Sequence, residues 1–131
     1  MSIVGIGTDL VAVSRLEAMQ RDHDDRLARR LLADSELGEY QRLMEAGPRP
    51  AAAFLARRFA AKEAAAKALG CGIGADASFR ALVVGHSAAG APTLELAGAA
   101  ARRADALGIR HTHLSISDER DYALAMVVME R

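Results

Sequence analysis

The sequence has one cysteine, three prolines, no tryptophan and no net charge. Cys71 alone cannot form an internal disulfide, and it offers no thiolate cluster for zinc. A formal charge of zero argues against general DNA or RNA binding, which usually needs a net basic surface. No apolar run reaches the roughly 20 residues that cross a bilayer, and the N-terminus lacks the basic start of a signal peptide. We therefore expect a cytoplasmic protein that contacts neither nucleic acid nor membrane.

Length and composition fit one folded domain. The 131 residues match a common domain size, with 51% apolar and 26% charged residues. Only 4% are aromatic, so the core must be built mainly from Ala, Leu and Val. Such a small domain can need a partner to bury its remaining apolar surface. We expect a single domain spanning residues 1–131.

Hydrophobic periodicity predicts helices mainly in the first half of the chain and strands mainly in the second. Helical spacing covers residues 11–19, 24–32, from 34 or 35 to 44, 50–69 and 97–107. Strand patterns cover residues 3–8, 79–86, 93–96, 111–117 and 122–129, the last two as an antiparallel hairpin. This order predicts an α+β fold with an antiparallel sheet packed on the long helix 50–69.

Asp9 is the first candidate functional residue. It follows a strand in which Gly5 and Gly7 leave one face without side chains, a pattern suited to close approach of another backbone or a ligand. A lone aspartate after a strand is more often a cap or turn residue. The glycine-stripped strand favours a site.

The long helix supplies the second candidate. Phe59, Glu63 and Lys67 recur every four residues and share a face, while Arg58 and Lys62 share the adjacent one. The simplest interpretation is a surface Glu63–Lys67 ion pair worth about 0.2–0.5 kcal/mol. One carboxylate among several cations on an alanine-lined helix also suits a polyphosphate bound with a divalent metal.

A glycine-rich loop and a strand histidine are weaker signals. Residues 70–74, Gly-Cys-Gly-Ile-Gly, end the long helix, and Gly70 alone would explain that end. Gly72 and Gly74 are additional and would let the backbone approach a ligand. His113 lies in an expected strand, where histidine is more often structural than catalytic.

Two segments resemble the signatures of the holo-acyl-carrier-protein synthases. The first is Gly-Ile-Gly-Thr-Asp-Leu at residues 5–10, followed by Arg15; the second is Arg-Phe-Ala-Ala-Lys-Glu-Ala-Ala-Ala-Lys-Ala at residues 58–68. The loop 70–74, the Gly90-x-Pro92 turn and His-Leu-Ser-Ile-Ser at 113–117 follow in that family's order. The resemblance covers essentially the whole chain.

The resemblance implies a 4′-phosphopantetheinyl transferase-like fold and a homotrimer with active sites at subunit interfaces. It also implies Mg²⁺-dependent transfer of 4′-phosphopantetheine from coenzyme A to a serine of an apo-acyl carrier protein, in fatty acid biosynthesis. Adenosine 3′,5′-bisphosphate would be the second product. A trimer would bury the apolar surface that such a small domain is expected to leave exposed.

Residue roles follow from the same resemblance. The metal carboxylates would be Asp9 and Glu63, and Lys67 would join them in catalysis. The coenzyme A contacts would come from Arg58, Lys62, Lys67, Gly72, Ile73, Gly74 and His113. The carrier-protein contacts would come from Arg15, Arg26 and Arg30.

The chain departs from many relatives at two positions, and two other functions stay open. Ala12 stands where many have a glutamate, and Asp118 where many have a histidine. One alternative is a non-catalytic module that binds coenzyme A or a nucleotide through the same cationic helix. The other is a structural partner in a larger synthase. Asp9 and Glu63 argue against both, since a pure binder has little need of a metal site.

Overall fold

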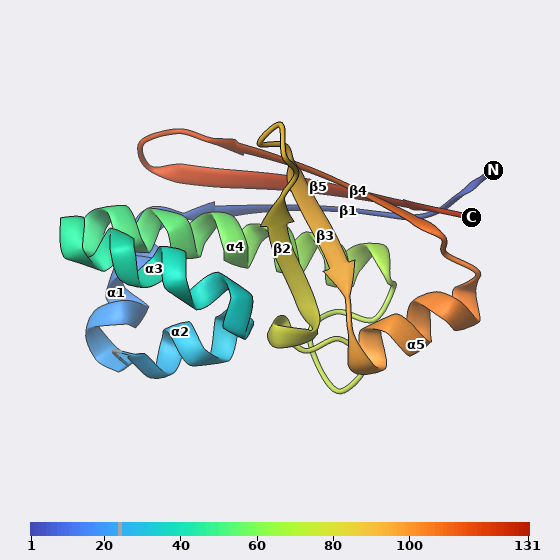
Figure 1. Cartoon of the computed structure of the whole chain (residues 1–131), viewed down its shortest axis with the longest axis horizontal. Coiled ribbons are helices and arrows are strands. Elements are labelled where there is room, and N and C mark those ends of the chain that lie inside the picture. Colours follow the sequence, from blue (N-terminus) through green and yellow to red (C-terminus); the bar gives the residue numbers. More distant parts are fainter. Residues whose placement is uncertain (24) are drawn as a thin grey trace.

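The computed structural model describes residues 1–23 and 25–131. Its elements confirm the expected α+β fold. A three-stranded sheet covers a long central helix, with shorter helices and a separate hairpin around the rest of that helix (Figure 1). None of the helices in these two ranges is long and apolar enough to cross a membrane.

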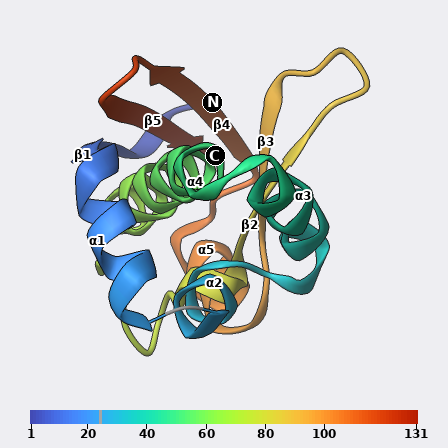
Figure 2. The same cartoon turned by 90° about the vertical axis from the view of Figure 1, so that its left-hand side faces the viewer.

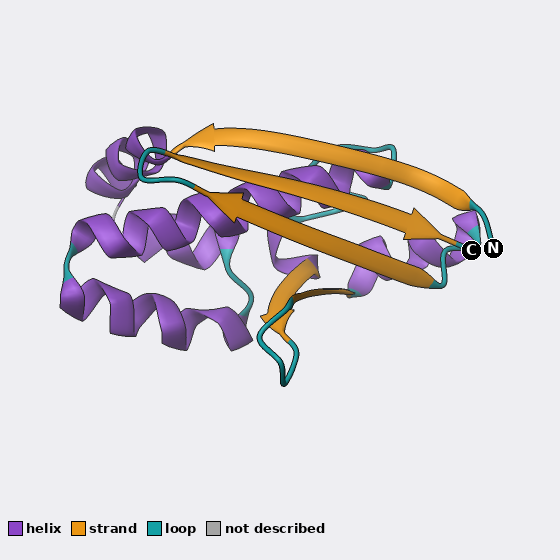
Figure 3. Cartoon of the chain, turned by 90° about the horizontal axis from the view of Figure 1, so that it is seen from above, coloured by secondary structure: helices purple, strands orange, loops and turns teal. Residues whose placement is uncertain are grey.

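The sheet has the order β1-β5-β4, from β1 (Ile3–Ala12), β5 (Tyr122–Glu130) and β4 (His111–Asp118). Both strand pairs are antiparallel, and β4 and β5 form the expected hairpin. Figure 3 shows the three strands lying across the helices, with both chain ends at the same end of the sheet.

Helix α4 (Pro48–Ala68) is the centre of the fold. Figure 2 views it nearly end-on, with the sheet on one side and α1, α3 and the β2–β3 hairpin around it. A Cβ added at Gly5 would lie 1.8 Å from the Ala68 carbonyl oxygen, and one at Gly7 would lie 2.0 Å from that of Ala64. The bare strand face therefore lets β1 approach the helix backbone. Most alanines of α4 are buried as well. The small residues of both surfaces had suggested that a ligand could lie there, but neither surface is free to receive one.

Three helices link β1 to α4: α1 (Val13–His23), α2 (Asp25–Leu31) and α3 (Asp34–Ala46). The expected start of the first helix at residue 11 was wrong, because β1 continues to Ala12 and pairs with Tyr122. The expected start of the second at Asp24 lies outside the described residues.

The second half contains a separate hairpin and a short helix. Strands β2 (Leu82–His86) and β3 (Pro92–Leu96) pair antiparallel, and α5 (Gly98–Leu107) follows. The expected strand 79–86 was partly wrong, since Phe79–Ala81 form the short 3-10 helix η1. Helix α5 ends at Gly108, whose φ of 75° favours glycine.

Among the residues that the structure describes, no helix packs on one face of the sheet (Figure 1). Opposite residues in an antiparallel ladder share a face, and Leu10 pairs with Leu124 while Thr8 pairs with Met126. The large apolar side chains exposed along this outer face are Ile6, Leu10, Tyr122, Leu124 and Met126. Gly5, Gly7 and Asp9 belong to the opposite face, toward α4.

Candidate active site

Asp9, Glu63 and Lys67 meet where β1 crosses the last turns of α4. Asp9 follows the close β1–α4 contact along the strand and is itself paired with the fully buried Ala125. The Lys67 Nζ donates to the Thr8 carbonyl oxygen at 2.9 Å and to the Asp9 Oδ1 at 3.2 Å. The i, i+4 spacing on α4 sets Glu63 one turn before Lys67. Strand and helix residues far apart in sequence thus form one acidic pair with a cation beside it.

The carboxyl groups of Asp9 and Glu63 lie where neither is fully compensated by neighbouring groups. The Asp9 Oδ2 is buried and has no hydrogen-bond partner. Burial raises the pKa of Glu63, and the nearby charge of Asp9 raises it further, while Lys67 and Arg15 act in the opposite direction. A buried oxygen without a donor and two mutually repelling carboxylates are both relieved by a bound cation.

The donor set fits Mg²⁺ and does not form a complete metal site by itself. Across residues 1–23 and 25–131, no three His, Cys, Asp or Glu side chains gather to hold a metal ion. Mg²⁺ needs no such cage, because it is commonly bound by one or two carboxylates together with water and substrate phosphate oxygens. Asp9 and Glu63 could supply that share of its ligands.

Beside Glu63 lies a groove with a volume of about 460 Å³. Its floor is apolar, with Phe59 and Phe79 in contact at a centroid distance of 5.6 Å. All three arginines that the sequence assigned to the carrier protein line it, and the Arg15 guanidinium lies 5.1 Å from the Phe59 ring centroid. The remaining lining residues are Met19, His23, Arg26, Leu27, Arg30, Leu31 and Ile73.

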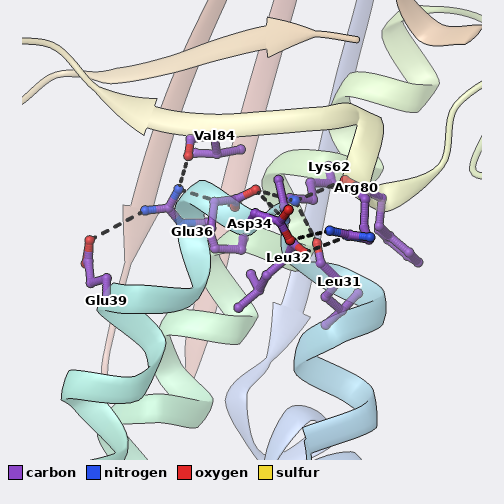
Figure 4. Close-up of polar contacts among 11 residues, drawn as sticks. Leu31, Leu32, Asp34, Glu36, Glu39, Lys62, Arg80 and Val84 are labelled. Carbon is purple, nitrogen blue, oxygen red and sulfur yellow. Dashed lines mark hydrogen bonds and ion pairs between the residues drawn. The ribbon is translucent and has the colours of Figure 1, made fainter. Parts of the chain in front are cut away.

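Lys62 does not reach this groove, which corrects the expected contact with phosphate. Its side chain is fully buried, and its ammonium donates to the Glu36 carboxylate at 2.7 Å and to the carbonyl oxygens of Leu31 and Phe79 (Figure 4). Those three acceptors use all of its donors. Lys62 therefore has a structural position, although Glu63 beside it faces the groove.

Arg58 is also buried, and it lies beside a different hollow. It donates to the Val84 carbonyl oxygen and to Glu36. The hollow, of about 170 Å³, is lined by Arg58 together with Arg57 and His86. Arg58 is thus not brought together with Glu63 and Lys67 inside one chain. Asp118, one of the two departures, lines the same hollow and pairs with Arg57 at 3.5 Å.

The glycine loop and His113 lie in different parts of the molecule. Ile73 lines the groove, whereas the space beside Gly72 and Gly74 is open, and Gly72 has a φ of 69°. His113 lies on the outer face of the sheet, where its Nε2 is 2.6 Å from a Glu130 carboxylate oxygen. It therefore lies on the face opposite Asp9.

Glu36 is the important residue that sequence reasoning missed. It is buried, accepts from Lys62, Arg58 and the Ala33 backbone N–H, and caps the start of α3. The sequence held only an indirect signal, in that Arg58 and Lys62 lie one turn apart on an alanine-rich helix, which the structure buries on nearly all sides. Two cations in such a helix require an acidic partner elsewhere.

Comparisons with known proteins agree with this fold. The family model of the 4′-phosphopantetheinyl transferase superfamily matches residues 5–127. A holo-[acyl-carrier-protein] synthase of Halorhodospira halophila is 53% identical over 127 residues, which are 97% of this chain and 97% of that protein. The crystal structure of holo-[acyl-carrier-protein] synthase from Neisseria meningitidis is 40% identical, with a TM-score of 0.87 over 99% of this chain and 100% of that one.

A third relative was crystallised with a ligand. It is a holo-(acyl-carrier-protein) synthase from Bacillus anthracis in complex with CoA (3′,5′-ADP), and it is 36% identical to this chain. Its TM-score is 0.79, and the match covers 97% of this chain and 96% of that one. The likeness thus extends over nearly the whole length in both sequence and structure, and the chain belongs to the 4′-phosphopantetheinyl transferase superfamily.

Proposed function

We propose that this protein transfers 4′-phosphopantetheine from coenzyme A to a serine of an apo-acyl carrier protein, with Mg²⁺, in fatty acid biosynthesis. The observation that carries the proposal is the buried, unpartnered Asp9 Oδ2 near Glu63, which lines a groove with three arginines. The family membership over nearly the full length supports the reaction type, and this pair supports a location for the chemistry.

In this reaction the serine Oγ forms a bond to the phosphorus on the pantetheine side of the pyrophosphate. The bond from that phosphorus to the bridging oxygen breaks, and the oxygen keeps the electron pair. The serine proton passes to solvent, and adenosine 3′,5′-bisphosphate leaves. Such transfers depend mainly on positioning and on neutralising charge.

Asp9 and Glu63 would hold the cation in this proposal. When bound, Mg²⁺ would offset negative charge on the phosphate oxygens. Asp9 is fixed by its strand pairing and Glu63 by its helix, so neither backbone has to move to offer an oxygen. Glu63 must be ionised to bind, and its raised pKa opposes this at acidic pH.

Lys67 would act on the leaving group. Its ammonium is half-exposed and is held against Asp9 by hydrogen bonds to two oxygens. A cation in that position can neutralise or protonate the departing bisphosphate oxygen. We retain the glycine loop, with Gly72, Ile73 and Gly74, as a coenzyme A contact, since Ile73 lines the groove.

The three arginines would bind the carrier. Arg15, Arg26 and Arg30 line the rim of a groove whose floor is apolar. A basic rim around an apolar floor suits an acidic helix that inserts one apolar side chain. Glu63 also lines the groove, so a carrier docked there would bring its serine toward the carboxylates.

We further propose a homotrimer whose active sites lie at subunit interfaces. The outer sheet face exposes Leu10, Leu124 and Met126 side by side, a patch of the kind that marks a protein contact. His113 on this face and Arg58 beside the second hollow cannot join Asp9 within one chain. Between copies, they would be free to contact coenzyme A in a neighbour's site.

The oligomer is tested with Leu124→Glu. This change puts a charge at the centre of the outer face and leaves the inner core untouched. We expect sedimentation to show monomers and transfer to be lost. A trimer that persists, or a monomer with full activity, would remove the interface from the proposal.

The function itself is tested by intact-mass analysis of apo-acyl carrier protein after incubation with this protein, coenzyme A and Mg²⁺. We expect the carrier to gain one phosphopantetheine, and to gain none with EDTA or with the Glu63→Ala variant. Binding of coenzyme A without transfer to several apo-carriers would instead support a non-catalytic binding module.

The lone Cys71 supports a reducing cytoplasm as the place of this reaction.

A further inference from the structure

The ammonium of Lys62 joins three separate segments around the groove. It donates to the Leu31 carbonyl oxygen at 2.6 Å, to the Phe79 carbonyl oxygen at 3.0 Å and to Glu36 at 2.7 Å (Figure 4). Leu31 is the last residue of α2, Phe79 the first of η1, and Glu36 lies in the first turn of α3. In the sequence, Leu31, Glu36 and Phe79 lie 31, 26 and 17 residues from Lys62.

Two of these segments form walls of the groove. The side chains of Leu31 and Phe79 both line it, while their carbonyl oxygens point to Lys62 on the other side of the backbone. Helix α2 also carries Arg26 and Arg30 of the groove rim. Lys62 therefore bonds α4 directly to the helix that carries this part of the basic wall.

The residue that follows Lys62 on α4 has a different environment. Glu63 follows Lys62 on the same helix and faces the groove instead of the core. One helical segment thus holds a carboxylate of the active site and the cation that fixes the opposite walls. A shift of α2 relative to this segment changes the separation of Arg26 and Arg30 from Glu63.

We infer that Lys62 is a positioning residue, which fixes the carrier-binding wall at the separation from Glu63 that aligns the carrier serine for transfer. This inference rests on the proposed function. It assigns Lys62 to the carrier side of the reaction, through α2 and η1. It predicts that the residue affects carrier use much more than coenzyme A binding.

A replacement of Lys62 alone also leaves Glu36 buried without its cation, so stability and positioning must be separated. Lys62→Met removes the ammonium at similar length. Lys62→Met/Glu36→Gln removes both charges and keeps an amide oxygen that can accept from Arg58 and the Ala33 N–H. Met129→Ala serves as the matched control, because it opens a buried cavity on the sheet opposite Gly5, away from α2 and η1.

The experiment measures, for each variant, the KM for apo-acyl carrier protein, the affinity for coenzyme A with Mg²⁺, and the melting temperature. All kinetics are run well below the lowest melting temperature. We expect both Lys62 variants to raise the carrier KM by about tenfold and to keep coenzyme A affinity within about twofold. The double variant should recover most of the melting temperature without recovering the carrier KM.

The opposing results are distinct. If the carrier KM of the double variant returns to the wild-type value together with its melting temperature, or Met129→Ala raises it equally, Lys62 is structural only. If coenzyme A affinity falls and carrier KM does not, Lys62 acts on the nucleotide and the inference is wrong. A wild-type protein that transfers nothing would contradict the proposed function and not this one alone.

Discussion

Lys62 and Glu63 are adjacent in the sequence, yet they belong to opposite kinds of charged cluster. Around Lys62, every charge has a partner: Glu36 accepts from Lys62 and from Arg58, and solvent is excluded. Around Glu63, the Asp9 Oδ2 has no donor, and burial together with the nearby charge of Asp9 raises the pKa of Glu63. The first cluster is complete within the chain, whereas the second would be completed by a cation in the proposed function. One helix thus carries a structural cluster and a functional one on consecutive residues.

The largest expected effect comes from removing a carboxylate of the incomplete cluster. Asp9→Asn and Glu63→Gln keep the side-chain shape but remove the anionic ligand. We expect either to lower kcat by about 10⁴-fold, roughly 5.5 kcal/mol of transition-state stabilisation, while the fold is retained. Intact-mass kinetics beside circular dichroism would measure both. A variant with more than a tenth of wild-type turnover would contradict the role of that carboxylate.

The next largest effect separates the two lysines of α4. Lys62→Met leaves Glu36 buried without its closest cation, and we expect the free energy of unfolding to fall by about 3–5 kcal/mol. Lys67→Met is the matched control, because the Lys67 side chain is half-exposed, and we expect a change within about 1 kcal/mol. Urea denaturation of both variants measures this difference. Equal losses would show that the two clusters do not differ as described.

A smaller effect concerns the groove rim. Arg26→Glu places a negative charge where an acidic carrier would dock, and we expect the carrier KM to rise by about tenfold. Arg102→Glu, an exposed arginine on α5, should leave it unchanged. Added salt should raise the carrier KM of the wild-type protein more than that of Arg26→Glu. A salt-independent KM would argue against an electrostatic docking surface.

The smallest effect is on stability as a function of pH. Because the pKa of Glu63 is raised in the folded state, the folded protein binds this proton more tightly than the unfolded chain. Without metal, the stabilisation from the bound proton is present below the ordinary glutamate pKa and is lost as pH rises through the raised value. Glu63→Gln should therefore melt higher than metal-free wild type at neutral pH, and the difference should shrink at acidic pH. A constant difference would contradict this.

Hydrophobic periodicity predicted much of the fold, but it did not predict which surfaces pack against one another. The hairpin of β4 and β5, the long helix and the loop after it were predicted correctly. The glycines of β1 and the alanines of α4 were interpreted as possible ligand surfaces, whereas they pack on each other. Small residues indicate close approach, and only the tertiary structure tells whether the approaching group is a backbone or a ligand.

The same limit applies to the candidate site. Asp9, Glu63 and Lys67 came together as predicted, because i, i+4 spacing fixes Glu63 and Lys67 on one face. Lys62 and Arg58 could not be distinguished from them, since α4 is apolar on nearly all sides and its sequence marks no single buried face. Glu36, which decides their role, is remote in sequence and had no motif of its own.

Binding of Mn²⁺, measured by electron paramagnetic resonance as a substitute for Mg²⁺, tests the central claim most directly. Wild-type protein, Asp9→Asn and the Lys62→Met/Glu36→Gln variant would be titrated with and without coenzyme A. We predict that wild type and the Lys62 variant bind the ion with similar affinity, and that Asp9→Asn loses the binding. Equal binding by Asp9→Asn, or loss of binding only in the Lys62 variant, would contradict the assignment of the incomplete cluster to the metal.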